Sequence, residues 1–272
     1  MKKKRIKRLF IWLVVLFIFF TVYFWIPVTE RIELDVKGDG EPVRVVLITD
    51  LHSCWYGPGE SWLISRIDKE KPDIVILSGD IFDDKIKDDN AKALLEDLVK
   101  KYPCYYVTGN HEFWSERAEE MKEYTASIGV NVLAGDCCNL EVNGSIFDIC
   151  GVDDPTRITS DSWIAQIDSA YSQTDKEHIR ILVSHRPETV QVYENYDFDL
   201  ILSGHAHAGQ FRIPFINKGL FAPNQGTFAE YVSGVYTLSN GSRLVVSRGL
   251  ARESTPAPRY FNHPEIVTII LK

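Results

Sequence analysis

Short apolar runs alternate along this chain with longer segments in which apolar residues recur at helical spacing. Strands separated by helices are typical of an α/β body. The apolar runs predict buried strands at 43–49, 74–78, 104–108, 179–183 and 200–202. The longer segments predict helices at 60–69, 90–101, 115–128 and 161–171.

Two Asn-Gly dipeptides add antiparallel strands to this α/β pattern, because Asn-Gly favours tight hairpin turns. Asn143-Gly144 separates 140–142 from 146–147, and Asn240-Gly241 joins 235–238 to 243–247. The alternation within 29–41 predicts an edge strand. No internal repeat or low-complexity tract interrupts the sequence that follows. We therefore predict a linker and edge strand at 27–42 and one domain at 43–272.

The N-terminal segment has a different character from the rest. Residues 9–26 carry no charge, and as a helix they would be about 27 Å long, close to the roughly 30 Å of a bilayer core. Because the segment is apolar on all sides, it is unlike the core helix of a globular protein. No small-residue cleavage site follows it, which argues against a cleaved signal peptide. Residues 1–8 are strongly basic. We predict an uncleaved signal anchor crossing the cell membrane once, with a cytoplasmic tail at 1–8 and the domain extracytoplasmic.

Composition and charge narrow the class of protein. The 272 residues are 45% hydrophobic and 25% charged, as in ordinary globular proteins. The net charge is −8, but six basic residues lie before Leu9, so the remainder has 24 basic and 38 acidic residues and a net charge of −14. Such an acidic body argues against nucleic acid as a partner. The five cysteines show no CxxC spacing, which argues against a disulfide framework or a structural zinc site.

Polar side chains follow each predicted strand of the α/β portion. In open α/β sheets the carboxyl ends of the strands form the ligand-binding crevice. Taken singly, each side chain has an ordinary explanation as a turn, cap or surface residue, but five of the seven histidines occur in these positions. The other two, His178 and His263, are predicted at the surface. The polar residues that follow the strands are Asp50, His52, Asp80, Asp83, Asn110, His111, Glu112, His185, His205 and His207.

The chemistry of these side chains predicts a metal centre. Carboxylate, imidazole and amide oxygen without thiolate suit divalent Mn, Fe or Zn. The ligands are too many for one ion. Two ions about 3.5–4 Å apart could share them, with one carboxylate bridging the two.

The order of these motifs resembles the metallophosphoesterase (calcineurin-like phosphoesterase) superfamily, and the resemblance extends from Val43 to the C-terminus. Within the superfamily the chain is similar to a small bacterial membrane-anchored branch, through residues 204–210 and a late strand at 263–267. Ala206 and Ala208 depart from the residues usual in that branch, as does 53–55 after the first motif. None of these departures removes a ligand. The motifs themselves are DLH at 50–52, GDIFD at 79–83, GNHE at 109–112, His185 and GHAH at 204–207.

The resemblance implies a β-sandwich flanked by helices and a role for each residue. Asp80 would bridge two metals, and His111 would be the general acid or stabilise a phosphoryl oxygen. Asp83 and Glu112 would orient imidazoles from outside the ligand set. Asp50, His52 and His207 would hold one metal, and Asn110, His185 and His205 the other.

The implied function is hydrolysis of a phosphodiester or pyrophosphate bond by metal-bound hydroxide, with His111 as proton donor. Proximity to the bilayer makes a lipid-linked phosphate the expected substrate class. Arg248, Arg252 and Arg259 are candidates for phosphate contacts or ordinary solvated arginines. The alternatives are a metal-dependent protein phosphatase and a non-catalytic scaffold of the same fold, against which the complete ligand set argues. The sequence leaves the oligomeric state open.

Overall fold

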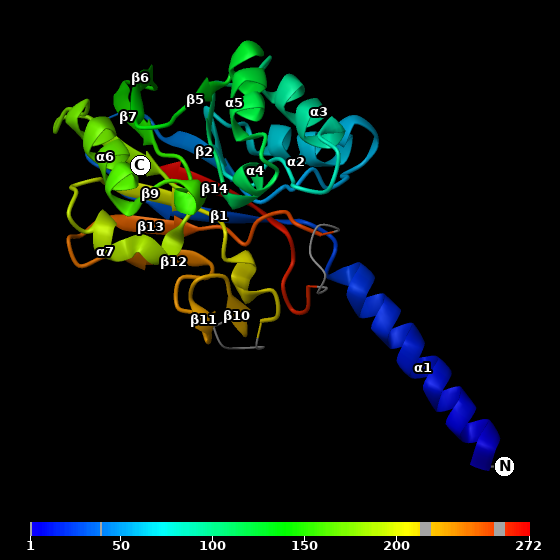
Figure 1. The fold of residues 1–272 in the computed structure, drawn as a ribbon. Coiled ribbons are helices and arrows are strands. Elements are labelled where there is room, and N and C mark those ends of the chain that lie inside the picture. Colours follow the sequence, from blue (N-terminus) through cyan, green and yellow to red (C-terminus); the bar gives the residue numbers. More distant parts are fainter. Residues whose placement is uncertain (1, 39, 213–218, 253–258) are drawn as a thin grey trace.

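Two six-stranded sheets pack face to face, with helices on their outer faces (Figure 1). The computed structural model of the chain describes residues 2–38, 40–212, 219–252 and 259–272. The strand orders are β1-β14-β2-β3-β4-β5 and β12-β13-β9-β8-β7-β6. This architecture confirms the predicted β-sandwich flanked by helices.

The first sheet contains the strands that precede the first three motifs in sequence, at 50–52, 79–83 and 109–112. Its strands β2, β3, β4 and β5 run parallel, while β14 is antiparallel to β2 and parallel to β1. The edge position of β1 agrees with the edge strand expected within 29–41. The bounds are β1 Val28–Leu34, β2 Val43–Ile48, β3 Ile74–Ser78, β4 Cys104–Val107, β5 Asn131–Val132 and β14 Glu265–Leu271.

The second sheet contains both predicted hairpins. The pairs β6–β7 and β12–β13 are antiparallel, whereas the adjacent pairs β7–β8, β8–β9 and β9–β13 are parallel. A separate short pair, β10 Phe221–Ala222 and β11 Gly226–Thr227, lies outside both sheets. The bounds are β6 Asp136–Val142, β7 Ser145–Gly151, β8 Ile179–Val183, β9 Leu200–Ser203, β12 Gly234–Thr237 and β13 Arg243–Val246.

Apolar helix faces cover the outer sides of the sandwich. Leu63 and Leu94 pack on the first sheet, and Trp163 packs on the second. The predicted helix at 115–128 begins later, because Glu116 adopts φ 62° and separates two helices. The helices are α2 Ser61–Glu70, α3 Asp89–Leu98, α4 Asn110–Trp114, α5 Ala118–Ser127, α6 Ser160–Ser172 and α7 Val190–Tyr193, with 3-10 turns η1 Pro58–Glu60, η2 Pro155–Arg157, η3 Pro187–Thr189 and η4 His207–Gly209.

The central core lies between the two sheets. Strands β3 and β8 are buried along their whole length, because each has a parallel neighbour on both sides and side chains packed on both faces. Leu47, Ile76, Phe147 and Ile181 meet in this layer. The layer fixes the position of the strand ends from which the polar motifs emerge.

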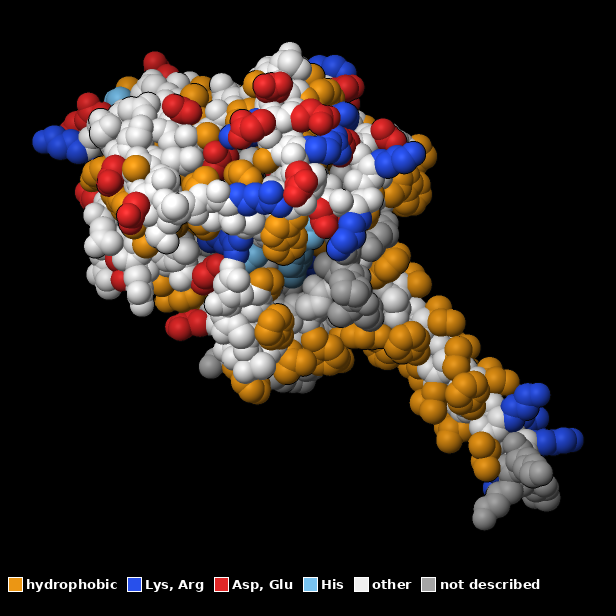
Figure 2. Space-filling model, viewed as in Figure 1, with side chains coloured by type: hydrophobic (Ala, Val, Ile, Leu, Met, Phe, Trp, Pro, Cys, Tyr) orange, Lys and Arg blue, Asp and Glu red, His pale blue; other side chains and the backbone are white. Residues whose placement is uncertain are grey.

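Helix α1, Lys2–Tyr23, extends away from the sandwich (Figure 1). Its segment Lys4–Tyr23 has a mean hydropathy of 2.1, and none of it is buried against the body. Lys and Arg side chains gather at its far end (Figure 2). The helix is long and apolar enough to cross a membrane.

One disulfide, Cys137–Cys150, joins β6 to β7. The absence of CxxC spacing gave no indication of this pair, which is a single bridge rather than the disulfide framework that the sequence argued against. The reason is the hairpin register, which places the two residues directly opposite each other. Cys104 and Cys138 keep free thiols.

Candidate metal centre

The predicted ligands meet at one edge of the sandwich, where strands of both sheets end. Asp50 and His52 follow β2, and Asp80 and Asp83 follow β3. Asn110 begins α4 directly after β4. The second sheet contributes His185 after β8, and His205 and His207 after β9.

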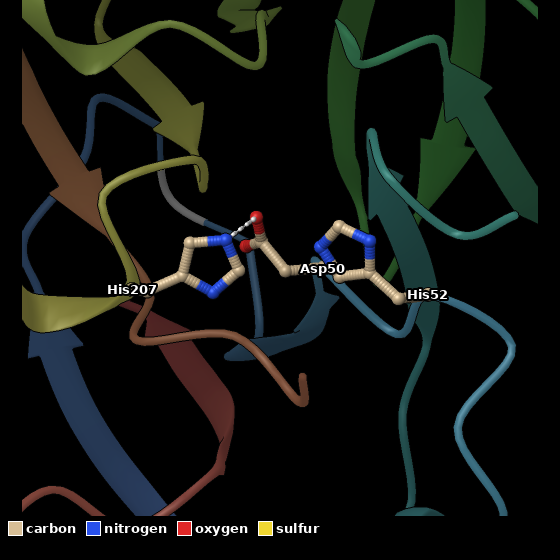
Figure 3. Close-up of side chains that lie close together, drawn as sticks. All are labelled: Asp50, His52 and His207. Carbon is tan, nitrogen blue, oxygen red and sulfur yellow. Dashed lines mark ion pairs between the residues drawn. The ribbon is translucent and has the colours of Figure 1, made fainter. Parts of the chain in front are cut away.

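These side chains form one continuous cluster. In three groups, one ligand atom from each residue lies within 4.8 Å of the others: Asp50–His52–His207, His52–Asp80–His111 and Asp80–His185–His205. Figure 3 shows the carboxylate of Asp50 between the imidazoles of His52 and His207. Because His52 and Asp80 each belong to two groups, they connect the whole set.

Four ligand atoms in this cluster are buried without a hydrogen-bond partner. Such an atom ordinarily costs about 1–3 kcal/mol. Asp80 Oδ2 lies 3.1 Å from His185 Nε2 and 3.7 Å from His52 Nε2, so these lone pairs converge. The donor set therefore fits divalent cations. The four atoms are His52 Nε2, Asp80 Oδ2, Asn110 Oδ1 and His185 Nε2.

Hydrogen bonds at Nδ1 orient the imidazoles of His185 and His52 so that Nε2 faces the cluster. His185 Nδ1 lies 2.8 Å from the carbonyl oxygen of Ser78. A carbonyl oxygen can only accept, so Nδ1 carries a proton, and in the neutral ring the lone pair is then on Nε2. His52 Nδ1 lies 3.0 Å from Asp83 Oδ2, with the same consequence.

Glycines allow the backbone to approach the ligands closely. Gly249 has φ 69°, and a Cβ atom there would lie 2.5 Å from Cβ of Asp50. A Cβ on Gly109 would collide with the carboxylate of Asp80. The sequence analysis did not single out Gly249, because it lies far along the chain from Asp50.

Glu112 joins two ligand loops rather than orienting an imidazole. Its buried carboxylate accepts hydrogen bonds from the backbone amides of Gly109, Asp80, Ile81 and Phe82, at 2.8–3.1 Å. Burial raises the pKa of Glu112 to about 7, with a further contribution from Asp80. The resemblance implied that Glu112 orients an imidazole. The hydrogen bonds instead show that it holds the loops after β3 and β4 together.

His111 lies at the open side of the cluster. Its side chain is 17% exposed, against 1% for His52. Its Nδ1 lies 2.7 Å from Asp84 Oδ1 and 3.4 Å from Asp83 Oδ2. Burial, the largest single influence, lowers the pKa of His111, but the contacts with Asp83, Asp80 and Asp84 together raise it to about 9. The sequence analysis missed Asp84, although it directly follows Asp83.

A buried ion pair that the sequence did not indicate lies beside His205. Arg186 binds Asp154 through Nε and Nη2, at 2.5 and 2.9 Å. Arg186 Nη1 lies 3.0 Å from His205 Nε2, and Asn224 Nδ2 lies 3.3 Å from the same nitrogen. The only sequence signal for Arg186 is its position next to His185.

The three candidate arginines differ in their surroundings. Arg248 forms salt bridges with Glu265 and Glu30 and is therefore held by these carboxylates rather than by the cluster. Arg252 stacks on the ring of Tyr56. Arg259 is buried, and its Nη2 lies 3.5 Å from His207 Nδ1. Of the three, Arg259 contacts a ligand residue.

The two remaining histidines lie outside the cluster but are not simple surface residues. His178 Nδ1 lies 3.0 Å from Asp148 Oδ1. His263 Nδ1 lies 2.9 Å from the carbonyl oxygen of Ile26. Both are half-buried by these contacts.

Known proteins resemble this chain in sequence and in fold. Residues 43–209 match the family described as calcineurin-like phosphoesterase. An uncharacterised metallophosphoesterase of Campylobacter jejuni is 29% identical over 250 residues, covering 90% of this chain and 63% of that protein. Phosphodiesterase YaeI of Escherichia coli is 26% identical over 205 residues, covering 73% and 72%.

Two further proteins extend the comparison. A transmembrane protein with a metallophosphoesterase domain from Danio rerio is 27% identical over 262 residues, covering 91% of this chain and 56% of that protein. The structure of NAD nucleotidase from Haemophilus influenzae has a TM-score of 0.50 at 15% identity, covering 79% of this chain and 46% of the other, which shows a shared fold. The chain thus spans little more than half the length of several relatives that it matches.

Proposed function

The chain belongs to the calcineurin-like phosphoesterase family, and on this premise we propose that it is a membrane-anchored phosphodiesterase with two divalent metal ions. The relative named phosphodiesterase YaeI, which this chain covers over 72% of its length, supports a diester as substrate. Hydrolysis of a pyrophosphate bond by the same centre is included in the proposal.

The observation that carries the proposal is the group of buried, unbonded ligand atoms around Asp80. Two divalent ions held there would supply a strong nucleophile at neutral pH and neutralise charge on the phosphoryl oxygens. Nitrogen and oxygen donors without thiolate suit Mn, Fe or Zn. We assign Asp50, His52 and His207 to one ion, Asn110, His185 and His205 to the other, and Asp80 to both.

The remaining polar residues are proposed to donate a proton to the leaving group and to bind the substrate. His111 reaches solvent, and Asp83 and Asp84 hold its Nδ1, so its ring is placed to give a proton to the leaving alkoxide. Asp83 also holds His52. Arg259, beside His207, is placed to attract a negatively charged phosphoester.

Helix α1 is proposed to anchor the body on the outer side of the cell membrane. Its basic end would stay in the cytoplasm. The disulfide Cys137–Cys150 is consistent with this orientation, because disulfides persist outside the reducing cytosol. An anchored body lies close to the bilayer, so we propose a lipid-linked phosphoester as the substrate class.

Metal analysis of the full chain and of Asp80→Asn, combined with rates on an aryl phosphodiester, tests the proposal. We expect two ions per chain, activity that chelation removes and Mn restores, and loss of both ions and of turnover in Asp80→Asn. Asp148→Asn is the matched control, because Asp148 is equally buried but bonds His178. Activity that survives exhaustive chelation would refute the two-metal proposal. A metal-loaded chain that hydrolyses only phosphoproteins would be a protein phosphatase, and one inert towards every phosphoester would be a scaffold.

A further inference from the structure

Five large apolar side chains stand exposed on the part of the body next to α1, where orange side chains gather in Figure 2. Their exposed fractions run from 38% to 58%, which is unusual for residues that soluble proteins bury. They come from three separate segments. We call them the apolar collar: Phe211, Leu220, Phe221, Phe228 and Phe261.

The collar is continuous with α1 through ring and backbone contacts. Phe24, at the end of the helix, lies 5.2 Å from Phe261, which lies 6.2 Å from Phe211. The backbone amide of Leu220 donates to Phe211, and that of Phe228 donates to Leu220. The exposed side chains therefore form a single surface that begins on the helix.

Tyr260, a neighbour of the collar, lies beside the last third of the candidate span. The rings of Phe17 and Tyr260 are 6.1 Å apart, and Tyr260 also lies 5.7 Å from Phe211. Phe17 precedes Tyr23, where the apolar helix ends, by six residues, or about 9 Å along a helix axis. Any bilayer that surrounds α1 up to Tyr23 would therefore also surround Tyr260.

The collar is joined to the proposed metal ligands. Phe211 lies four residues after His207 in the same loop. Asn262, next to Phe261, donates to the carbonyl oxygens of His207 and Gln210, at 2.7 and 3.1 Å. The depth of the collar therefore sets the distance between His207 and the bilayer.

From these contacts we infer that the apolar collar inserts into the outer leaflet and holds the metal cluster at the lipid headgroups. The inference rests on the proposed function and narrows it: the substrate is a phosphoester that stays in the membrane while it is cleaved. The depth of about 9 Å derived for Tyr260 agrees with the roughly 5–10 Å reached by apolar faces that lie in the interface. The site therefore takes headgroup phosphoesters in preference to soluble ones.

Two exposed tryptophans near the end of the helix support the same inference. Trp55 and Trp62 are 45% and 55% exposed, with rings 4.9 Å apart. Arg252 donates a hydrogen bond to the carbonyl oxygen of Trp55, and its guanidinium lies 5.5 Å from the ring of Trp25, so this group also adjoins the helix end. Indole rings are enriched at the membrane–water interface, where arginine side chains also act as anchors.

Depth-dependent quenching measures the insertion directly. Phe228→Cys in a Cys138→Ser background is labelled with an environment-sensitive fluorophore, and the full chain is placed in vesicles of phosphatidylethanolamine and phosphatidylglycerol. We expect strong quenching by lipids with a nitroxide high on the acyl chain and protection from iodide. Ile146→Cys is the matched control, since Ile146 is 38% exposed on β7, away from α1. If iodide quenches a label at 228 as readily as one at 146, the collar does not insert. Protection from both iodide and the nitroxide lipids would indicate a contact with protein and would also overturn the inference.

Rates on two substrates separate this inference from the proposed function. Phe221→Ser combined with Phe228→Ser should leave hydrolysis of a soluble aryl diester unchanged and slow a diester lipid in vesicles by about tenfold or more, given the apolar area lost. An equal effect on both substrates would overturn the role of the collar. A wild-type chain inert towards both would instead overturn the proposed function, whatever the quenching shows.

Discussion

The carboxylate of Asp83 lies 3.0 Å from Nδ1 of His52, and both side chains are almost completely buried. Burial, the largest influence, raises the pKa of Asp83, but hydrogen bonds from His111, His52 and the backbone of Ile86 together hold it well below its usual range. Asp83 therefore stays an acceptor, and the proton of His52 stays on Nδ1. This bond decides which nitrogen of His52 faces the cluster.

Replacing Asp83 should weaken metal binding without removing a ligand. Asp83→Asn can turn a donor towards His52 Nδ1, so we expect a loss of affinity of about 10–100-fold. Asp84→Asn is the control, because Asp84 bonds His111 and leaves His52 untouched. Competition with a metal-sensitive dye measures both, and equal losses in the two variants would contradict the assignment.

Removing the imidazole of His111 should affect leaving groups unequally. His111→Ala should slow hydrolysis of an alkyl diester by about 10²–10⁴. A nitrophenyl diester should be slowed much less, because nitrophenolate leaves without a proton. Both ions should remain bound. If the variant loses an ion, His111 is a ligand, as its position within 4.8 Å of His52 and Asp80 would allow.

Glu112→Gln should destabilise the metal-free protein. The amide group would point N–H donors at backbone amides that now donate to the carboxylate, which leaves buried donors unpaired. Each carboxylate oxygen accepts from two amides, so two amides lose their acceptor in either orientation of the glutamine, and we expect the free energy of unfolding to fall by about 1–3 kcal/mol for each. Denaturant titration in chelator measures this value. Glu119→Gln, at a side chain that is 75% exposed, should leave it unchanged.

The thiol of Cys104 should resist alkylation in the folded protein. Burial raises its pKa to about 12, and only the thiolate reacts. Its labelling should therefore be negligible near pH 8 and should rise about tenfold per pH unit towards pH 12. Cys138 is more exposed and should react first. Mass spectrometry locates the label, and rapid reaction at Cys104 near pH 8 in folded protein would show that β4 is open to solvent.

The orientation of α1 predicts where the C-terminus lies. A phosphatase reporter fused after Lys272 should be active only outside the cytoplasm, because the basic residues before Leu9 should remain inside. Trapping of thiols in intact cells should also find Cys137 and Cys150 oxidised. A reporter active only in the cytoplasm would reverse the proposed topology.

The sheet and the clustering of the polar side chains could be predicted because both depend on local pattern. Strands β3 and β8 are fully buried, so they appear as unbroken apolar runs, and the residues after them emerge at the same edge. The disulfide could also be predicted from the sequence, through the positions of the two cysteines relative to a hairpin turn. Cys137 lies five residues before Val142, and Cys150 lies five after Ser145, so the Asn143-Gly144 turn already pairs them.

Other contacts depend on tertiary geometry that no local pattern contains. Arg186 reaches Asp154 because β7 and β8 are neighbours in the sheet, although the two residues are far apart in sequence. Glu112 bonds the amides of the loop after β3 instead of its neighbour His111. The helix predicted at 115–128 was shorter because one residue, Glu116, adopts a left-handed conformation.

The pairing of β1 with β14 has a consequence for biosynthesis. Val28, directly after α1, lies opposite Glu265, and β14 separates β1 from β2 in the sheet. A ribosome releases β1 early and β14 last among these strands, so the first sheet stays incomplete throughout elongation. In the proposed topology, α1 is already in the bilayer while the body is still unfolded. The export machinery therefore handles an unfolded chain, and the ligands of the two sheets assemble only after β14 has crossed.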